Sequence, residues 1–352
     1  MKSQRIGALA LLGIAAACSE GTAPNAGSVD AQRVKQGIAV VERVAASKLL
    51  GSLHAVGRAA NDVGAVQSPM GWSPGLEHAV RTLSTAAVSS GTALIPVMRS
   101  SVLGTTFIYD PVARKYVPDA TRTDAPFNGV RFILYDVDPN EDPLAGKEIG
   151  YADLTDERRA SSSTAGVQLR VVTGGVTRLQ YSFDITGSLQ TAQIDVAGYI
   201  TDGSDRLDFT IKTTQQLFAR GGPATLEARL YVPQEDFEVR AKVSGIAGEE
   251  GGGGDGSVDL AIRSRYDDIS VDAETNRGVL DASFRFNGEL FATASGDPKA
   301  PVLRASDGRE LTDEEMQVVG AIVGMAHGIF TFVSDLLEPA GVLLLIALGV
   351  GA

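Results

Sequence analysis

Four oxygen-bearing side chains at alternate positions form the most metal-like motif in the chain. The spacing D-x-D-x-N-x-D is formed by Asp136, Asp138, Asn140 and Asp142. Carboxylate and amide oxygens at alternate positions suit calcium. The EF-hand loop also requires glycine at its sixth position and glutamate at its twelfth, where this chain has Glu141 and Lys147. We therefore expect an acidic turn between strands at 130–137 and 148–154 in place of a strong calcium site, and we predict no metal site.

A serine-hydrolase motif occurs near the N-terminal third of the chain. Residues 71–75 read G-W-S-P-G and match G-x-S-x-G, the nucleophile elbow. In that elbow the backbone N–H after the serine donates to the oxyanion, and Pro74 has no N–H to donate. His78 lies only five residues beyond Ser73. We expect a turn before a helix here, no catalytic residues, and a protein that is not an enzyme.

The remaining composition argues against several classes of site. Residues 249–256 are rich in glycine but lack the lysine and serine or threonine that end a phosphate loop, so we expect a hairpin loop. Three histidines and one cysteine leave little for a zinc site and allow no intrachain disulfide. A chain with 31 basic and 43 acidic residues, net charge −12, is a poor nucleic-acid partner. We predict no cofactor and no nucleic acid.

The N-terminus has the pattern of a secretory signal. Lys2 and Arg5 precede an apolar run over residues 6–17, which is too short to span a bilayer and ends in three alanines. The only cysteine of the chain, Cys18, follows where cleavage is expected. We therefore predict a signal peptide over residues 1–17.

This arrangement resembles the precursors of bacterial lipoproteins, in which a small-residue box ends in a cysteine that is diacylated. The resemblance implies lipidation of Cys18 and a membrane anchor, although Ala15 stands where leucine is commonest in that family. Ser19 replaces the aspartate that retains many lipoproteins in the inner membrane, which favours the outer membrane, periplasmic side. Two or more acyl chains anchor a protein stably, and residues 18–30 would form a flexible tether. Plain secretion with an ordinary cysteine is the alternative.

The pattern of apolar residues changes along the mature chain. Residues 30–60 have helical periodicity, and a shorter helix is expected over 76–89. From about residue 105 to 305 the period becomes two, with on the order of 10 to 13 half-buried strands. Hairpin turns are expected at 173–175, at 202–204 and, most clearly, at Asn287-Gly288.

The C-terminal region returns to a helical pattern. Thr312 and Glu315 form a capping box that predicts a helix start, and Glu338-Pro339 predicts its end. Glycines at 320, 324 and 328 place a smooth stripe on one helix face. Such a stripe lets a helix lie tightly on a sheet, and in membranes or oligomers it lets helices approach closely. We favour a core helix with a buried His327. Two alternatives for this helix stay open, namely a bilayer-inserted segment and an oligomer contact.

Together these patterns predict an α+β fold, mainly β, with a long curved antiparallel meander covered by N-terminal and C-terminal helices. One domain would span residues 31–337, with an apolar tail over 338–352. The architecture resembles the half-barrel lipoproteins that carry acyl chains in the bacterial envelope. The resemblance implies a non-enzymatic protein that binds a hydrophobic or acyl ligand on the concave face of its sheet.

A structural or interaction lipoprotein with a filled core and no small ligand is the alternative. The volume of the apolar rows separates the two. Alanine and valine opposite Gly320, Gly324 and Gly328 would fill the gap between helix and sheet, whereas a row of leucine and phenylalanine that faces no helix would leave a pocket.

Overall fold

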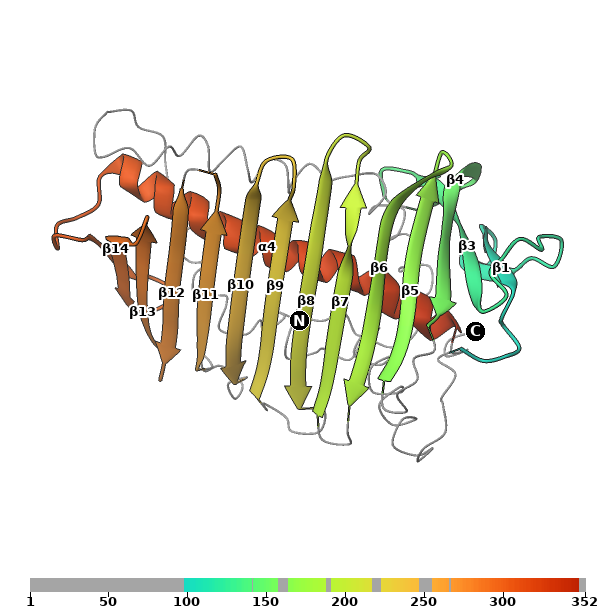
Figure 1. The fold of residues 1–352 in the computed structure, drawn as a ribbon, viewed down its shortest axis with the longest axis horizontal. Helices are drawn as coiled ribbons and strands as arrows, with labels where there is room; N and C mark the ends of the chain where they lie inside the picture. The colour runs from blue at the N-terminus through green and yellow to red at the C-terminus, as the bar shows by residue number, and fades with distance from the viewer. Residues whose placement is uncertain are drawn as a thin grey trace. The chain divides into compact units, whose positions relative to one another are not determined.

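The computed structural model describes residues 98–140, 142–157, 164–187, 191–216, 223–246, 255–265 and 267–347. These residues form fifteen strands and one long helix, α4 (Asp313–Ala347), so the mainly β character of the fold is confirmed (Figure 1). The expected helices at 30–60 and 76–89, the motif at 71–75 and Cys18 all lie outside the described residues.

The strands fill the region where period two was predicted. They are β1 (Thr105–Asp110), β2 (Lys115–Pro118), β3 (Gly129–Val137), β4 (Pro143–Asp156), β5 (Thr164–Thr173), β6 (Val176–Gly187), β7 (Thr191–Thr201), β8 (Arg206–Gln216), β9 (Pro223–Val232), β10 (Phe237–Ile246), β11 (Gly256–Arg263), β12 (Asp268–Asn276), β13 (Val279–Phe286), β14 (Glu289–Gly296) and β15 (Val302–Ala305). The short strands β2 and β15 carry too few residues to show alternation, which is why the sequence predicts fewer strands.

From β3 to β15 the strands are hydrogen-bonded in chain order, so the predicted meander is confirmed. The other end departs from it, because β1 lies parallel to β3 and pairs antiparallel with β2 on its outer side. The described residues fall into two compact units, one within 211–332 and one formed by 98–210 and 333–347, with boundaries inside β8 and α4.

Alternation along the strands separates a buried apolar face from a polar face. In β6 the apolar residues at positions 179, 181, 183 and 185 are 0–3% exposed. In β10, Phe237, Val239 and Ala241 follow the same pattern at 1–5% exposed. Because side chains point to opposite faces with a period of two, this alternation fixes which face of each strand is covered.

Tight turns join the strands where the sequence predicts them. Asn287 and Gly288 have φ of 49° and 83°, and Gly174 and Gly175 have φ of 56° and 77°. Positive φ at both central residues suits the two-residue hairpins β13–β14 and β5–β6. The hairpin β12–β13 uses the same backbone at residues 277–278, with φ of 49° and 77°, and was not predicted because its first residue is arginine.

Helix α4 begins at the predicted capping box. The Thr312 N–H donates to Glu315 Oε2 at 2.8 Å, and the Glu315 N–H donates to Thr312 Oγ1 at 3.3 Å. The predicted end at Pro339 is wrong, because the helix continues to Ala347 and includes residues 338–347 of the expected tail.

Tyr181 supports the helix near this proline. Pro339 lacks the N–H that would pair with the carbonyl four residues earlier in the helix. The Tyr181 hydroxyl donates to the carbonyl oxygen of Leu336 at 3.0 Å, one residue away from the carbonyl that the proline leaves unpaired. Burial raises the pKa of the Tyr181 hydroxyl, which therefore remains a donor. This bond fixes α4 to the sheet beside the proline.

The glycine stripe does not face the sheet. In each unit α4 crosses the strands on one side (Figure 1). Its buried side chains in the first unit are Val319, Ile322, Val323, Ala326, Ile329 and Phe332. At 100° per residue the glycines lie on the opposite side of the helix. Gly324 and Gly328 are exposed, and a Cβ at either position would meet nothing within 4 Å.

The expectation that the glycine stripe packs against the sheet is therefore wrong, although the helix itself is a core helix. The side chain of His327 is outside the described set. Across the ranges given above, no helix is both long and apolar enough to cross a membrane.

Candidate functional site

The acidic motif forms the turn between β3 and β4, as predicted. Asp138 Oδ1 accepts the backbone N–H groups of Asn140 at 2.8 Å and Asp142 at 2.9 Å. Asp142 Oδ2 pairs with Arg114 at 2.9 Å. These oxygens stabilise the turn itself, and no three His, Cys, Asp or Glu residues in the described part of the chain are arranged to hold a metal ion.

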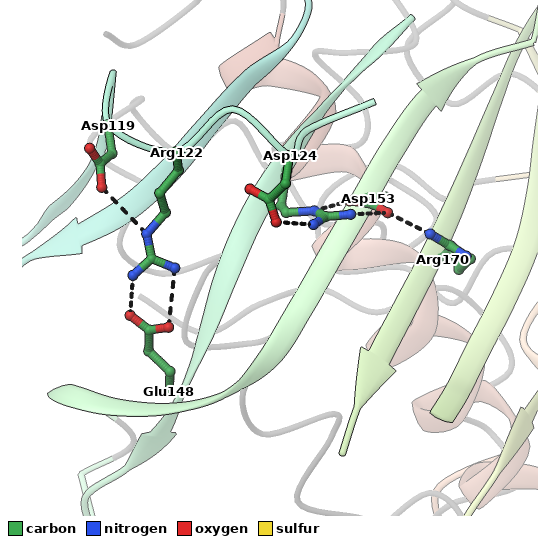
Figure 2. A network of polar contacts seen from close by, with 7 residues as sticks. Asp119, Arg122, Asp124, Glu148, Asp153 and Arg170 are labelled. Carbon is green, nitrogen blue, oxygen red and sulfur yellow. Dashed lines mark hydrogen bonds and ion pairs between the residues drawn. The ribbon is translucent and has the colours of Figure 1, made fainter. Parts of the chain in front are cut away.

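The strongest candidate site is a charged network on β3, β4 and β5 (Figure 2). The strand register places Arg131 opposite Asp153 and Asp153 opposite Arg170. Arg131 donates from Nε and Nη2 to the two oxygens of Asp153 at 2.7 and 3.0 Å, and Arg170 adds a third bond at 2.9 Å. The Asp153 side chain is 2% exposed and that of Arg131 10%, so this is a buried bidentate ion pair.

Two further groups complete the environment of Arg131. Its guanidinium carbon lies 3.7 Å from the centroid of the Tyr151 ring, and Nη1 donates to Asp124 at 2.5 Å. Burial alone would lower the pKa of Arg131, but hydrogen bonding to Asp153 and the charges of Asp153 and Asp124 outweigh burial and raise it. The guanidinium is therefore a permanent cation at any physiological pH.

The network also holds the segment that joins β2 to β3, residues 119–128, which we call the β2–β3 loop. Arg122 donates to both carboxylate oxygens of Glu148 on β4 at 3.1 and 2.5 Å (Figure 2). At the end of the loop, Asn128 Nδ2 donates to the carbonyl of Asp156 at 3.1 Å, and the Asp156 N–H donates to the carbonyl of Asn128 at 2.9 Å. The loop is therefore fixed to β3 and β4 at three points.

The chemistry of this network is positioning, not proton transfer. Arginine does not give up its proton in proteins, and both carboxylate oxygens of Asp153 accept bonds from arginine side chains. Thr106, opposite Arg131 in the register, is fully buried, and its Oγ1 has no hydrogen-bond partner. A hydroxyl without a base beside it is a weak nucleophile.

The opposite face of the same strands is apolar. The register aligns Val130, Leu154, Leu169 and Tyr181, which are 0–2% exposed. In the other unit the register aligns Ala273, Ala282 and Ala294 on β12–β14, at 0–7% exposed. Small side chains on the sheet leave room for the branched side chains of a helix that crosses it.

Sequence reasoning did not find the charged network. A signal was present, because Arg131 and Asp153 are single charges within short apolar runs, G-V-R-F-I-L and G-Y-A-D-L. A charge inside a strand that is otherwise buried on both faces usually has a partner. The sequence does not show which partner, since that depends on the register of two strands.

Comparisons with known proteins give no relative. No family model, no curated protein and no solved structure matches this chain. A functional assignment therefore rests on the residues of the chain itself.

Proposed function

We propose that the chain is a lipid-anchored protein of the bacterial cell envelope, without enzymatic activity, that acts as a structural or interaction module. Diacylated Cys18 would hold it at the outer membrane, on the periplasmic side. Support comes from the sole cysteine at the end of a secretory signal and from the polar segment after it. The charged network orients the β2–β3 loop, which suits an interaction module.

One observation favours the filled core over a ligand carrier. Within the first unit, Phe284, Leu230 and Ile322 on the apolar faces of sheet and helix are 0–1% exposed. Side chains with so little accessible surface border neither solvent nor a void large enough for water. At these three positions the apolar face has no surface left for an acyl chain.

A ligand carrier is the second candidate, and a different residue favours it. In this version the sheet would curve as a half-barrel around an acyl chain, with helices at both ends of the sequence as cover. Thr213 lies on the apolar face of β8, is 0% exposed, and its Oγ1 has no hydrogen-bond partner. Ligand sites are largely apolar with a few placed polar groups, and such a hydroxyl could pair with the head of an amphiphile.

Native mass spectrometry distinguishes the two. The chain beginning at residue 28 is purified from its host without detergent. A filled core gives the mass of the polypeptide alone, whereas a carrier gives an additional lipid mass. Thr213→Val sharpens the comparison, because a filled core loses only an unpaired buried hydroxyl and becomes equally or more stable in urea. A carrier would instead lose bound lipid in this variant.

A further inference from the structure

The β2–β3 loop presents a phenylalanine to solvent. Phe127 is 90% exposed, although it is the bulkiest of the large apolar side chains that the described residues expose. The residues around it, Ala125-Pro126-Phe127-Asn128-Gly129, carry no charge. Burial of this side chain in an apolar medium would therefore desolvate no neighbouring ionic group of the same segment.

The loop that carries Phe127 is held in place before any contact is made. The Gly129 N–H donates to the carbonyl of Pro126 at 3.1 Å and closes a turn around the phenylalanine. On either side the loop is fixed by the Asp124–Arg131 ion pair and by the reciprocal bonds between Asn128 and Asp156. A loop backbone held in this way loses little conformational entropy when its exposed side chain binds.

The same unit contains a natural comparison in Val112, which is 92% exposed at the tip of the β1–β2 hairpin. Strands β1 and β3 are parallel, and the hairpin follows β1 whereas the loop with Phe127 precedes β3. The two tips therefore lie at opposite ends of the strands. Val112 also lies between Asp110 and Arg114. The tip of the β1–β2 hairpin is therefore charged, whereas the segment around Phe127 is neutral.

We propose that Phe127 inserts into the lipid surface to which the N-terminal anchor holds the protein, and so orients the second unit on the membrane. The proposal rests on the lipid anchor proposed above. A single side chain is far smaller than the roughly 800 Å² per partner of a stable protein interface. A tethered protein, in contrast, needs only a weak second contact, because the tether supplies a high local concentration. The net charge of −12, which becomes −14 when Lys2 and Arg5 leave with the signal peptide, favours zwitterionic over anionic lipid.

The test attaches the protein to a bilayer chemically. The chain beginning at Cys18, its sole cysteine, is coupled to a maleimide lipid in phosphatidylcholine vesicles, and Phe127→Trp is compared with Val112→Trp. Emission of the unsubstituted chain, which contains only Trp72, is subtracted. We expect the tryptophan at 127 to emit at shorter wavelength on coupling and to be quenched by lipids brominated in the acyl chains. The tryptophan at 112 should keep the emission of a solvent-exposed indole.

Two results would overturn the proposal. One is unchanged emission and no bromine quenching at position 127, which would leave the exposed phenylalanine to a protein partner. The other is an equal response at positions 127 and 112, which would indicate non-specific adsorption. Both positions are at least 90% exposed, so neither substitution disturbs packing, and far-ultraviolet circular dichroism checks the fold. Chemical coupling replaces natural acylation in this test. A negative result for insertion of Phe127 is therefore distinguishable from a failure of the proposed lipidation of Cys18.

Discussion

Replacing Glu315 by glutamine removes the carboxylate that closes the first turn of α4. This carboxylate accepts two bonds from Arg309, at 2.6 and 2.7 Å, and two from the N–H and hydroxyl of Thr312, at 2.8 and 3.1 Å. Hydrogen bonding to Arg309, with smaller contributions from Thr312, lowers the pKa of Glu315 from 4.5 to about 2. The charged carboxylate thus stabilises the folded state.

The size of the effect follows from the pKa difference. A shift of this size corresponds to at most about 3 kcal/mol. Solvent screening reduces this value, because the Arg309 side chain is 45% exposed. We expect Glu315→Gln to cost about 1–2 kcal/mol at pH 7. Since the folded pKa is depressed, this stability is fully present above about pH 5 and is lost as the pH falls toward 2. The difference between wild type and variant should shrink over that window.

The assay is urea unfolding of the chain beginning at residue 28, at pH 7 and at several values down to pH 2.5. Glu310→Gln is the matched control, since Glu310 is exposed and only its backbone carbonyl bonds to Arg309. The control should change the free energy of unfolding by less than about 0.5 kcal/mol. A Glu315→Gln variant as stable as wild type at pH 7 would refute the reasoning, as would a difference that does not depend on pH.

Three further substitutions test the packing. Asp153→Asn leaves the buried Arg131 with only the exposed Asp124 as counter-charge and should cost about 3 kcal/mol in urea unfolding; a loss below about 1 kcal/mol would contradict the buried pair. Gly324→Leu should be neutral or stabilising by up to about 1 kcal/mol, because it adds a better helix former on an open face; clear destabilisation would place the glycine against other residues. Tyr181→Phe should cost about 1–2 kcal/mol, since it leaves the Leu336 carbonyl with one fewer donor; an unchanged free energy of unfolding would dismiss that bond.

Local patterns predicted much of the fold. The change to period two near residue 105 and its end near 305 coincide with the first and last strands, because alternation is a property of each strand by itself. The Asn287-Gly288 turn and the capping box at Thr312 are likewise decided by residues that are neighbours in sequence. Such features require no knowledge of what packs against them.

Features set by distant residues could not be predicted in the same way. Arg131 and Asp153 are 22 residues apart and meet only because β3 and β4 pair in one register. Pro339 stays within α4, where Tyr181, 155 residues away from Leu336 in sequence, donates to the neighbouring turn. The glycine stripe lies on the exposed face of α4 and not against the sheet, because the apolar residues, and not the glycine spacing, define the buried side of an amphipathic helix.

The same distinction between local and distant residues applies to the candidate site. The acidic turn between β3 and β4 was predicted correctly, since the bonds that Asp138 accepts come from residues within four positions of it. The charged network and the position of the loop that it holds were not predicted. The proposed anchor stays a prediction from sequence, because Cys18 lies outside the described residues.

Metabolic labelling with an alkyne fatty acid tests the proposed lipid anchor most directly. Wild-type chain and Cys18→Ser are expressed in a bacterial host, and label on the chain is read after coupling to an azide dye. The account predicts label on the membrane-bound wild type, and none on the variant, which remains an uncleaved precursor or is released in soluble form. Equal label on both chains, or an unlabelled wild type recovered from the soluble fraction, would contradict it.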